Sequence, residues 1–184
     1  MAVVIAMLRG VNVGGHNKIS MDGLREICRS LKLRNPQTYI QSGNVVFGTT
    51  ERDVTRIARR IEDAIEKNLS FRPHVILRTT TDMREVIGRN PFTGRSGLDP
   101  AKLNISFLAD TPSADVRERL LSLKVGPEEL KIEGRELYIY FPDGMGRSKL
   151  VPVLDRTLKT PATVRNWNTV ARLLEMAESL EASA

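Results

Sequence analysis

The stretch Met7–Lys18, MLRGVNVGGHNK, has the composition of a loop that could bind phosphate. It follows an apolar run, holds three glycines within six residues and precedes a predicted helix, which is where nucleotide-binding proteins place their phosphate loops. The spacing excludes both standard types, because His16-Asn17 stand where a P-loop has Lys-Ser or Lys-Thr, and Asn12 stands where a dinucleotide fingerprint has glycine. Two interpretations stay open: an anion-binding loop of no standard type, or glycines that only allow a tight turn.

A second polar loop, QSGN at Gln41–Asn44, is predicted to lie beside the first. In a βαββαβ unit the crossover connections make strand one parallel to strand two. The end of strand one and the turn between strands two and three therefore project from the same edge of the sheet. Glycine amides and a helix N-terminus attract anions, although Asp22 in the first helical turn opposes this. The residues expected to gather at this edge are Arg9, Asn12, Gly14, Gly15, Asn17, Lys18, Gln41, Ser42 and Asn44.

The stretch TVRNWNTV, at the start of the last predicted helix, is another candidate. Trp167 could stack on a base while Arg165 holds a phosphate. The alternative is that Trp167 packs in the core while Asn166 or Asn168 caps the helix.

DGMGRSK, Asp143–Lys149, is a second glycine-rich turn that leads into a predicted helix. Arg147 and Lys149 make it either a second anion site or only a turn in which Ser148 caps the helix. Lys149 therefore joins Arg165, Asn166 and Trp167 as a candidate ligand residue.

The charge of the chain permits a nucleic-acid partner. Lys and Arg number 28 against 22 Asp and Glu, so the net charge is +6, which favours phosphate-bearing partners only mildly. Tyr138 and Tyr140 point to one face of a predicted strand, as base-stacking aromatics do in RNA-recognition modules, but aromatic residues make up only 5% of the chain. One predicted helix carries a basic face, which Asp63 is expected to pair in part: Arg52, Arg56, Arg59 and Arg60.

Residues suited to catalysis are few. His16 and His74 are the only histidines, and neither neighbours a carboxylate or a cysteine in sequence. The chain has no H-E-x-x-H spacing and no G-x-S-x-G elbow, so no metal site is expected and no cofactor or reaction is assigned. By topology, Ser42 with Lys18 or His16 is the nearest candidate for a nucleophile and its base. The lone Cys28 excludes an internal disulfide and lies on an apolar helical stripe, so it is predicted to be a core residue.

The elements that would position these residues follow the order βαββαβ in the first half. The patterns predict a strand at Val3–Leu8, a helix capped by Ser20, a hairpin within Thr38–Phe47, a helix capped by Thr50 and a strand at His74–Thr79. The hairpin is expected to turn at Ser42-Gly43, where glycine can adopt a positive φ.

The same order recurs roughly 100 residues later, after a short helix and a Pro/Gly/Ser-rich connector. KLNISFLA and ATVRNW read as strands, SADVRERLLSL as a helix, and LKIEGRELYIYF as a hairpin turning near Gly134. SKLVPVLDRTL reads as a helix whose first turn Pro152 delays or kinks.

We therefore expect an α+β chain of two ferredoxin-like βαββαβ halves with antiparallel sheets, plus a C-terminal helix. The predicted division is residues 1–89, the connector 90–100 and residues 101–184. The alternative is an ordinary alternation of short α and β segments, but a matched hairpin in each half argues against it.

The composition is that of a soluble protein without a membrane segment. The chain has 184 residues, of which 41% are hydrophobic and 27% charged, and VVIAML is too short to span a bilayer. No positively charged segment precedes VVIAML, and a single cysteine suits the cell interior, so the protein is expected in the cytoplasm. The sequence does not indicate an oligomeric state.

Several stretches together resemble the family named domain of unknown function 1697: LRGVNVGGHNKI, TYIQSGNVVF, RNPF, SKL and TVRNWNTV. The family is bacterial and uncharacterised, so the resemblance implies a fold of two small α+β subdomains and no reaction. Its signature positions correspond here to Arg9, Gly10, Asn12, Gly14, Gly15, Lys18, Gln41, Ser42, Gly43, Asn44, Asn90, Pro91, Phe92, Ser148, Lys149, Arg165, Asn166, Trp167 and Thr169.

The leading functional hypothesis is a binding site for a phosphorylated small molecule or a nucleotide. Arg9, Lys18 and the backbone around Gly14-Gly15 would bind the phosphate, and Ser42 and Asn44 would orient the ligand. The alternatives are a module that binds RNA or DNA, and an enzyme of unknown reaction that uses the same loops.

Overall fold

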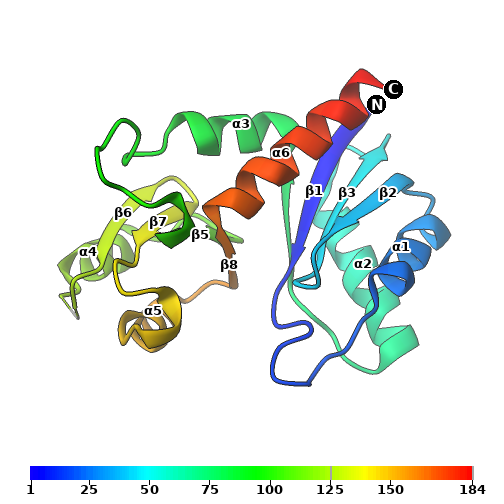
Figure 1. The fold of residues 1–184 in the computed structure, drawn as a ribbon. Coiled ribbons are helices and arrows are strands. Elements are labelled where there is room, and N and C mark those ends of the chain that lie inside the picture. The colour runs from blue at the N-terminus through cyan, green and yellow to red at the C-terminus, as the bar shows by residue number, and fades with distance from the viewer. Residues whose placement is uncertain (125, 184) are drawn as a thin grey trace. The chain divides into compact units, whose positions relative to one another are not determined.

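The structure is a computed structural model that describes residues 1–124 and 126–183 (Figure 1). The chain forms two compact units. The first consists of Met1–Arg84 and the C-terminal segment from Arg172, and the second of Glu85–Ala171.

The first unit has the predicted order βαββαβ. Its sheet has the strand order β2-β3-β1-β4 with every neighbouring pair antiparallel, which is the ferredoxin-like arrangement. The elements are β1 (Ala2–Leu8), α1 (Met21–Ser30), β2 (Arg34–Tyr39), β3 (Asn44–Thr49), α2 (Val54–Leu69) and β4 (Val75–Thr79).

The second unit repeats this arrangement with the strand order β6-β7-β5-β8, again antiparallel throughout. The prediction of two ferredoxin-like halves with a C-terminal helix is therefore confirmed. The elements are β5 (Leu103–Leu108), α4 (Ala114–Ser122), β6 (Glu129–Glu133), β7 (Glu136–Tyr140), α5 (Leu150–Thr157) and β8 (Ala162–Asn166), with short 3₁₀ turns η1 (Pro100–Lys102) and η2 (Met145–Arg147).

Two further helices, α3 (Thr80–Gly88) and α6 (Trp167–Ala182), each contribute residues to both units. The C-terminal part of α6 belongs with the first unit, where Arg84 on α3 donates hydrogen bonds of 2.8 Å to both Glu178 and Glu181. Such pairing between segments far apart in sequence cannot be read from a pattern. The predicted domain boundaries at residues 90–100 stay a prediction.

The two helices of the first unit begin at side-chain caps. Ser20 caps α1 as predicted, because its hydroxyl accepts a hydrogen bond of 3.0 Å from the Gly23 amide. The predicted cap of α2 is wrong: Asp53, not Thr50, accepts from the Arg56 amide at 3.1 Å. A carboxylate is as good a cap as a hydroxyl, and capping by Asp53 starts α2 at Val54.

The core of the first unit lies between the sheet and the helices α1 and α2. Leu24, Ile27 and Cys28 on α1 pack with Val4 and Phe47 of the sheet. Burial raises the pKa of the Cys28 thiol to about 12, as expected for an unreactive core cysteine. A separate cluster, which includes Leu120, Leu137 and Leu154, forms the helix-facing core of the second unit.

The strand pairing of β1 with β4 recurs in the pairing of β5 with β8. Ile5 on β1 lies opposite Arg78 on β4, and Ile105 on β5 lies opposite Arg165 on β8. Both arginines are buried. The two halves therefore share a buried arginine at the equivalent position of the last strand.

Among the described residues, no helix combines the length and the apolar content that crossing a bilayer requires.

Candidate functional site

The connection between β1 and α1, residues 9–20, is called the glycine loop here. Its tip is a tight turn in which the His16 amide donates to the Val13 carbonyl at 3.0 Å. Gly14 and Gly15 between them have φ values of +57° and +78°. This conformation is costly for residues with a Cβ, so the turn requires the two glycines whether or not it binds a ligand.

The side chain of Asn12 connects the glycine loop to the turn between β2 and β3 by hydrogen bonds. Its side-chain amide donates to the Ile19 carbonyl at 2.9 Å and the Gln41 carbonyl at 2.8 Å, and its Oδ1 accepts from the Ile19 amide at 2.9 Å. Asn17 adds a bond of 3.0 Å to the Gly10 carbonyl. The two loops are therefore joined at one sheet edge, as the topology predicted, and Asn12 serves to hold them rather than to present a free amide.

The turn between β2 and β3 packs against the end of β1. Leu8 donates its amide to the Gly43 carbonyl at 2.9 Å, and a Cβ at Gly43 would lie 2.5 Å from Val11 Cγ2. The buried Asn44 supports the turn from beneath, donating to the Tyr39 carbonyl at 3.1 Å and to Ser42 Oγ at 3.0 Å. The candidates Ser42 and Asn44 thus shape the turn.

Ile40, in the same turn, is held in an unfavourable conformation. Its φ is +50°, which β-branched residues rarely adopt, and its side chain is 48% exposed. Packing of Gly43 on β1 and the bond from Asn12 to Gln41 fix the segment after the strained residue, and the bond from Asn44 to the Tyr39 carbonyl fixes the residue before it.

A hollow of about 450 Å³ opens between the two loops. None of the described residues lining it carries a carboxylate, and the side chain of Lys18 has no hydrogen-bond or ion-pair partner in the described chain. Asp22, which was expected to repel anions, forms an ion pair with Arg25. Arg9 does not line the hollow. The lining residues are Asn12, Gly15, Lys18, Ile19, Ser20 and Gln41.

Because Asn12 joins the two loops through its hydrogen bonds, the variant Asn12→Ala should be less stable than the wild type. Three hydrogen bonds are lost and the amide and carbonyl of Ile19 lose their partner, so the free energy of unfolding should fall by about 1–3 kcal/mol. Amide exchange at Ile19 should accelerate, which hydrogen–deuterium exchange can follow. Asn68→Ala, which removes one exposed bond on α2, is the matched control; equal exchange at Ile19 in both variants would contradict the role of Asn12.

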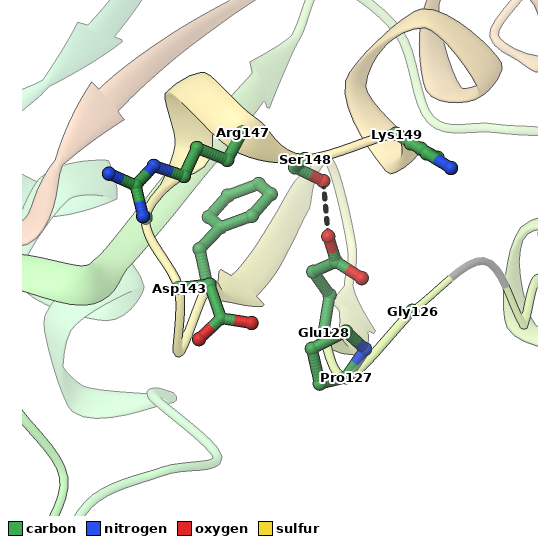
Figure 2. Close-up of a pocket in the computed structure, with 9 residues that line it drawn as sticks. Gly126, Pro127, Glu128, Asp143, Arg147, Ser148 and Lys149 are labelled. Atoms are coloured by element: carbon green, nitrogen blue, oxygen red, sulfur yellow. Dashed lines mark hydrogen bonds between the residues drawn. The ribbon is translucent and has the colours of Figure 1, made fainter.

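The DGMGRSK turn borders a pocket of about 360 Å³ in the second unit (Figure 2). Ser148 accepts a hydrogen bond of 3.0 Å from the Leu150 amide, at the first residue of α5, and donates to the Glu128 carboxylate. The N-cap of α5 is Lys149, whose side chain makes no cap bond, so the prediction that Ser148 caps the helix is wrong; Ser148 bonds the first helical amide from one residue before the N-cap. Pro152 lies in the first turn of α5, where its missing N–H leaves no helical bond unmade, so it does not delay the helix.

The pocket contains residues that the sequence did not single out. Glu128 precedes β6 and Phe141 follows β7, and they meet the predicted Lys149 only in the fold. Arg147 was a candidate from the same turn, whereas nothing in the spacing distinguished the charge of Asp143 from that of an ordinary exposed loop.

The candidates on β8 and α6 have structural partners. Arg165 is buried and donates to Thr163 Oγ1 at 2.7 Å and to the Val164 carbonyl at 2.9 Å, and burial lowers its pKa to about 10. Asn166 caps α6 by accepting from the Asn168 amide at 3.0 Å. Trp167 is half-buried as the first residue of α6. Arg165, Asn166 and Trp167 are not among the described residues lining the pocket of their unit.

Several of the aromatic and basic side chains that could have bound nucleic acid are buried or bonded within the protein. Tyr138 is fully buried and donates its hydroxyl to the Val86 carbonyl at 2.7 Å, so it cannot stack on a base. Tyr140 packs near Phe92, with ring centroids 6.4 Å apart, and beneath the Arg95 guanidinium.

On α2, Arg60 donates to the Leu31 carbonyl at 2.8 Å, and Arg56 pairs with Glu51 at 3.7 Å. The expected pairing of Asp63 with Arg59 is wrong. Asp63 pairs with Arg72 instead, because the chain after α2 brings that guanidinium to the carboxylates along the helix.

Comparison with known proteins agrees with the repeated fold. The family model described as "Protein of unknown function (DUF1697)" matches residues 1–138, which include the glycine loop and the β2–β3 turn. The chain belongs to the DUF1697 family.

A solved structure shares the fold across nearly the whole length of this DUF1697 chain. The conserved bacterial protein SP0830 from Streptococcus pneumoniae superposes with a TM-score of 0.77 at 22% identity, covering 97% of this chain and 99% of its own. A search of curated proteins finds no match. The DUF1697 assignment therefore establishes the architecture, and function has to be argued from the site.

Proposed function

We propose that the protein binds a phosphate-bearing small molecule, a sugar phosphate or a nucleotide, in the hollow between the glycine loop and the β2–β3 turn. The observation that carries this proposal is the unpartnered Lys18 at a hollow whose described lining holds no carboxylate. A cation without a carboxylate partner beside exposed glycine amides favours an anion over a cation or an apolar ligand.

The loops support such a ligand by being held in place before it arrives. Asn12 and Asn17 fix the glycine loop, so its amides near Gly14 and Gly15 need little ordering on binding. Lys18 would bind the phosphate through its ammonium group, and the exposed side chain of Gln41 would orient the rest of the ligand. Ser42 and Asn44 would act through the shape of the β2–β3 turn, and Arg9, which does not line the hollow, would contribute only its positive charge.

We also propose that the protein is located in the bacterial cytoplasm. A bacterial cytoplasmic protein would meet phosphorylated metabolites, and the similarity to a conserved bacterial protein and the buried, unpaired Cys28 support that setting.

A thermal-shift screen tests the proposal with inorganic phosphate, hexose phosphates, AMP and ATP. At least one of these should raise the melting temperature of the wild type, and Lys18→Ala should weaken binding about 10–100-fold, the loss expected for one charge-assisted hydrogen bond. Lys67→Ala, which removes an exposed lysine from α2 of the same unit, is the control and should bind as the wild type does.

The same screen separates the other candidates. If none of these ligands protects the wild type, or if Lys18→Ala binds as well as Lys67→Ala, the proposal is wrong. Binding of single-stranded RNA that falls steeply with salt would instead support a nucleic-acid module, which the exposed Arg52, Arg56 and Arg59 favour. An enzyme using these loops would need Ser42 as nucleophile, whose Oγ accepts a hydrogen bond from Asn44.

A further inference from the structure

The pocket of the second unit is lined by charges of both signs. Asp143 and Glu128 contribute carboxylates, and Arg147 and Lys149 contribute cations, around a volume of about 360 Å³. This pocket shares no described lining residue with the hollow of the first unit.

We propose that this pocket binds a small zwitterion that carries a primary ammonium group and a carboxylate, namely a free amino acid or a dipeptide. Three features of the pocket favour such a ligand: unpaired charges, an incompletely bonded carboxylate and the layout of the four charged side chains.

The charges in the pocket do not neutralise one another. In the described chain, no ion pair within 4.0 Å joins Asp143 or Glu128 to Arg147 or Lys149, although all four line the same space. A ligand of one sign would leave the opposite charges without a partner and repel the like ones. A ligand with both signs complements the whole set.

Glu128 is fixed but incompletely satisfied. One carboxylate oxygen accepts from Ser148, which is itself bonded to the Leu150 amide, so the side chain is held in one orientation. The other oxygen, Oε2, is shielded from solvent and accepts no hydrogen bond from the described residues. The charge of a carboxylate in this state is stabilised by a nearby ammonium group.

The layout assigns the two ends of the ligand. Figure 2 shows Glu128 reaching up to Ser148 with Asp143 on the Arg147 side of it, and Arg147 and Lys149 extending to opposite sides of Ser148. The ammonium group would lie between the two carboxylates. The ligand carboxylate would pair with Arg147, whose planar guanidinium can donate two parallel hydrogen bonds, and Lys149 would contribute charge without that geometry.

Isothermal titration calorimetry on the full chain tests the assignment with free amino acids and dipeptides. The same amino acids without their carboxylate, as amines, and without their ammonium group, as acids, serve as probes. Binding should require both groups and weaken at least about tenfold when either is missing. Stronger binding by dipeptides than by free amino acids, or the reverse, identifies the source of the zwitterion.

Substitutions of the charged residues that line the pocket test whether the ligand binds there. Arg147→Gln and Asp143→Asn should each weaken binding at least about tenfold, and Lys149→Gln less. Lys159→Gln and Glu118→Gln, two exposed changes elsewhere in the second unit, should have no effect, nor should Lys18→Ala in the first unit. The proposal is overturned if no zwitterion binds, if the amine or the acid alone binds as tightly, or if the pocket variants match the controls.

Discussion

Replacing Gly43 by alanine should lower the free energy of unfolding by about 2–5 kcal/mol, a large fraction of the stability of a small domain. Two costs add. Gly43 has a φ of +77°, which costs a residue with a Cβ about 1–2 kcal/mol. The added methyl group would also lie 2.5 Å from Val11 Cγ2 and 3.0 Å from Leu8 Cβ, and such overpacking costs about 1–3 kcal/mol.

Gly10→Ala separates the two costs. Gly10 has a similar φ of +69°, but a Cβ there would meet nothing within 4 Å. Urea unfolding of this variant should therefore show only the conformational cost of about 1–2 kcal/mol. If the two variants lose the same stability, the close packing of the β2–β3 turn on β1 does not constrain the site as described.

Phe47→Ala should be at least as damaging, with a loss of about 3–5 kcal/mol. Phe47 on β3 is fully buried, lies opposite Val4 on β1 and packs in the core beneath α1 and α2. Truncation removes apolar contact and leaves a cavity that the surrounding strands cannot collapse to fill.

Phe71→Ala is the matched control for Phe47, since the same atoms are removed from a partly buried position at the margin of the same core. Its loss of stability in urea unfolding should be clearly smaller. A loss at Phe71 as large as that at Phe47 would show that the core is not centred between the sheet and the two helices.

The fold was predictable because its signals are local and repeated. The central strands β1 and β5 are short apolar runs, α1 and α2 carry apolar stripes, and a hairpin follows the first helix of both halves. Right-handed crossovers then fix the sheet order, and with it the meeting of the glycine loop and the β2–β3 turn, which the bond from Asn12 to Gln41 shows directly.

The roles of single side chains were less predictable, because hydrogen-bond partners come from distant segments. Asn12 and Asn44 were expected to face a ligand, and each supports a turn instead. Asp63 pairs with Arg72 beyond the end of the helix rather than with Arg59 one turn away. The pocket of the second unit combines residues from before β6 and after β7, and no single stretch of sequence contains that combination.

The repeated register of the two sheets has an evolutionary consequence. Matching strand orders and a buried arginine opposite equivalent isoleucines are what duplication of one ancestral βαββαβ gene segment would leave. The two copies differ where the first strand meets the first helix: residues 9–20 make this connection in one copy and residues 109–113 in the other. The glycine loop therefore belongs to one copy alone, and its buried Val11 and Ile19 have become part of the core of that copy.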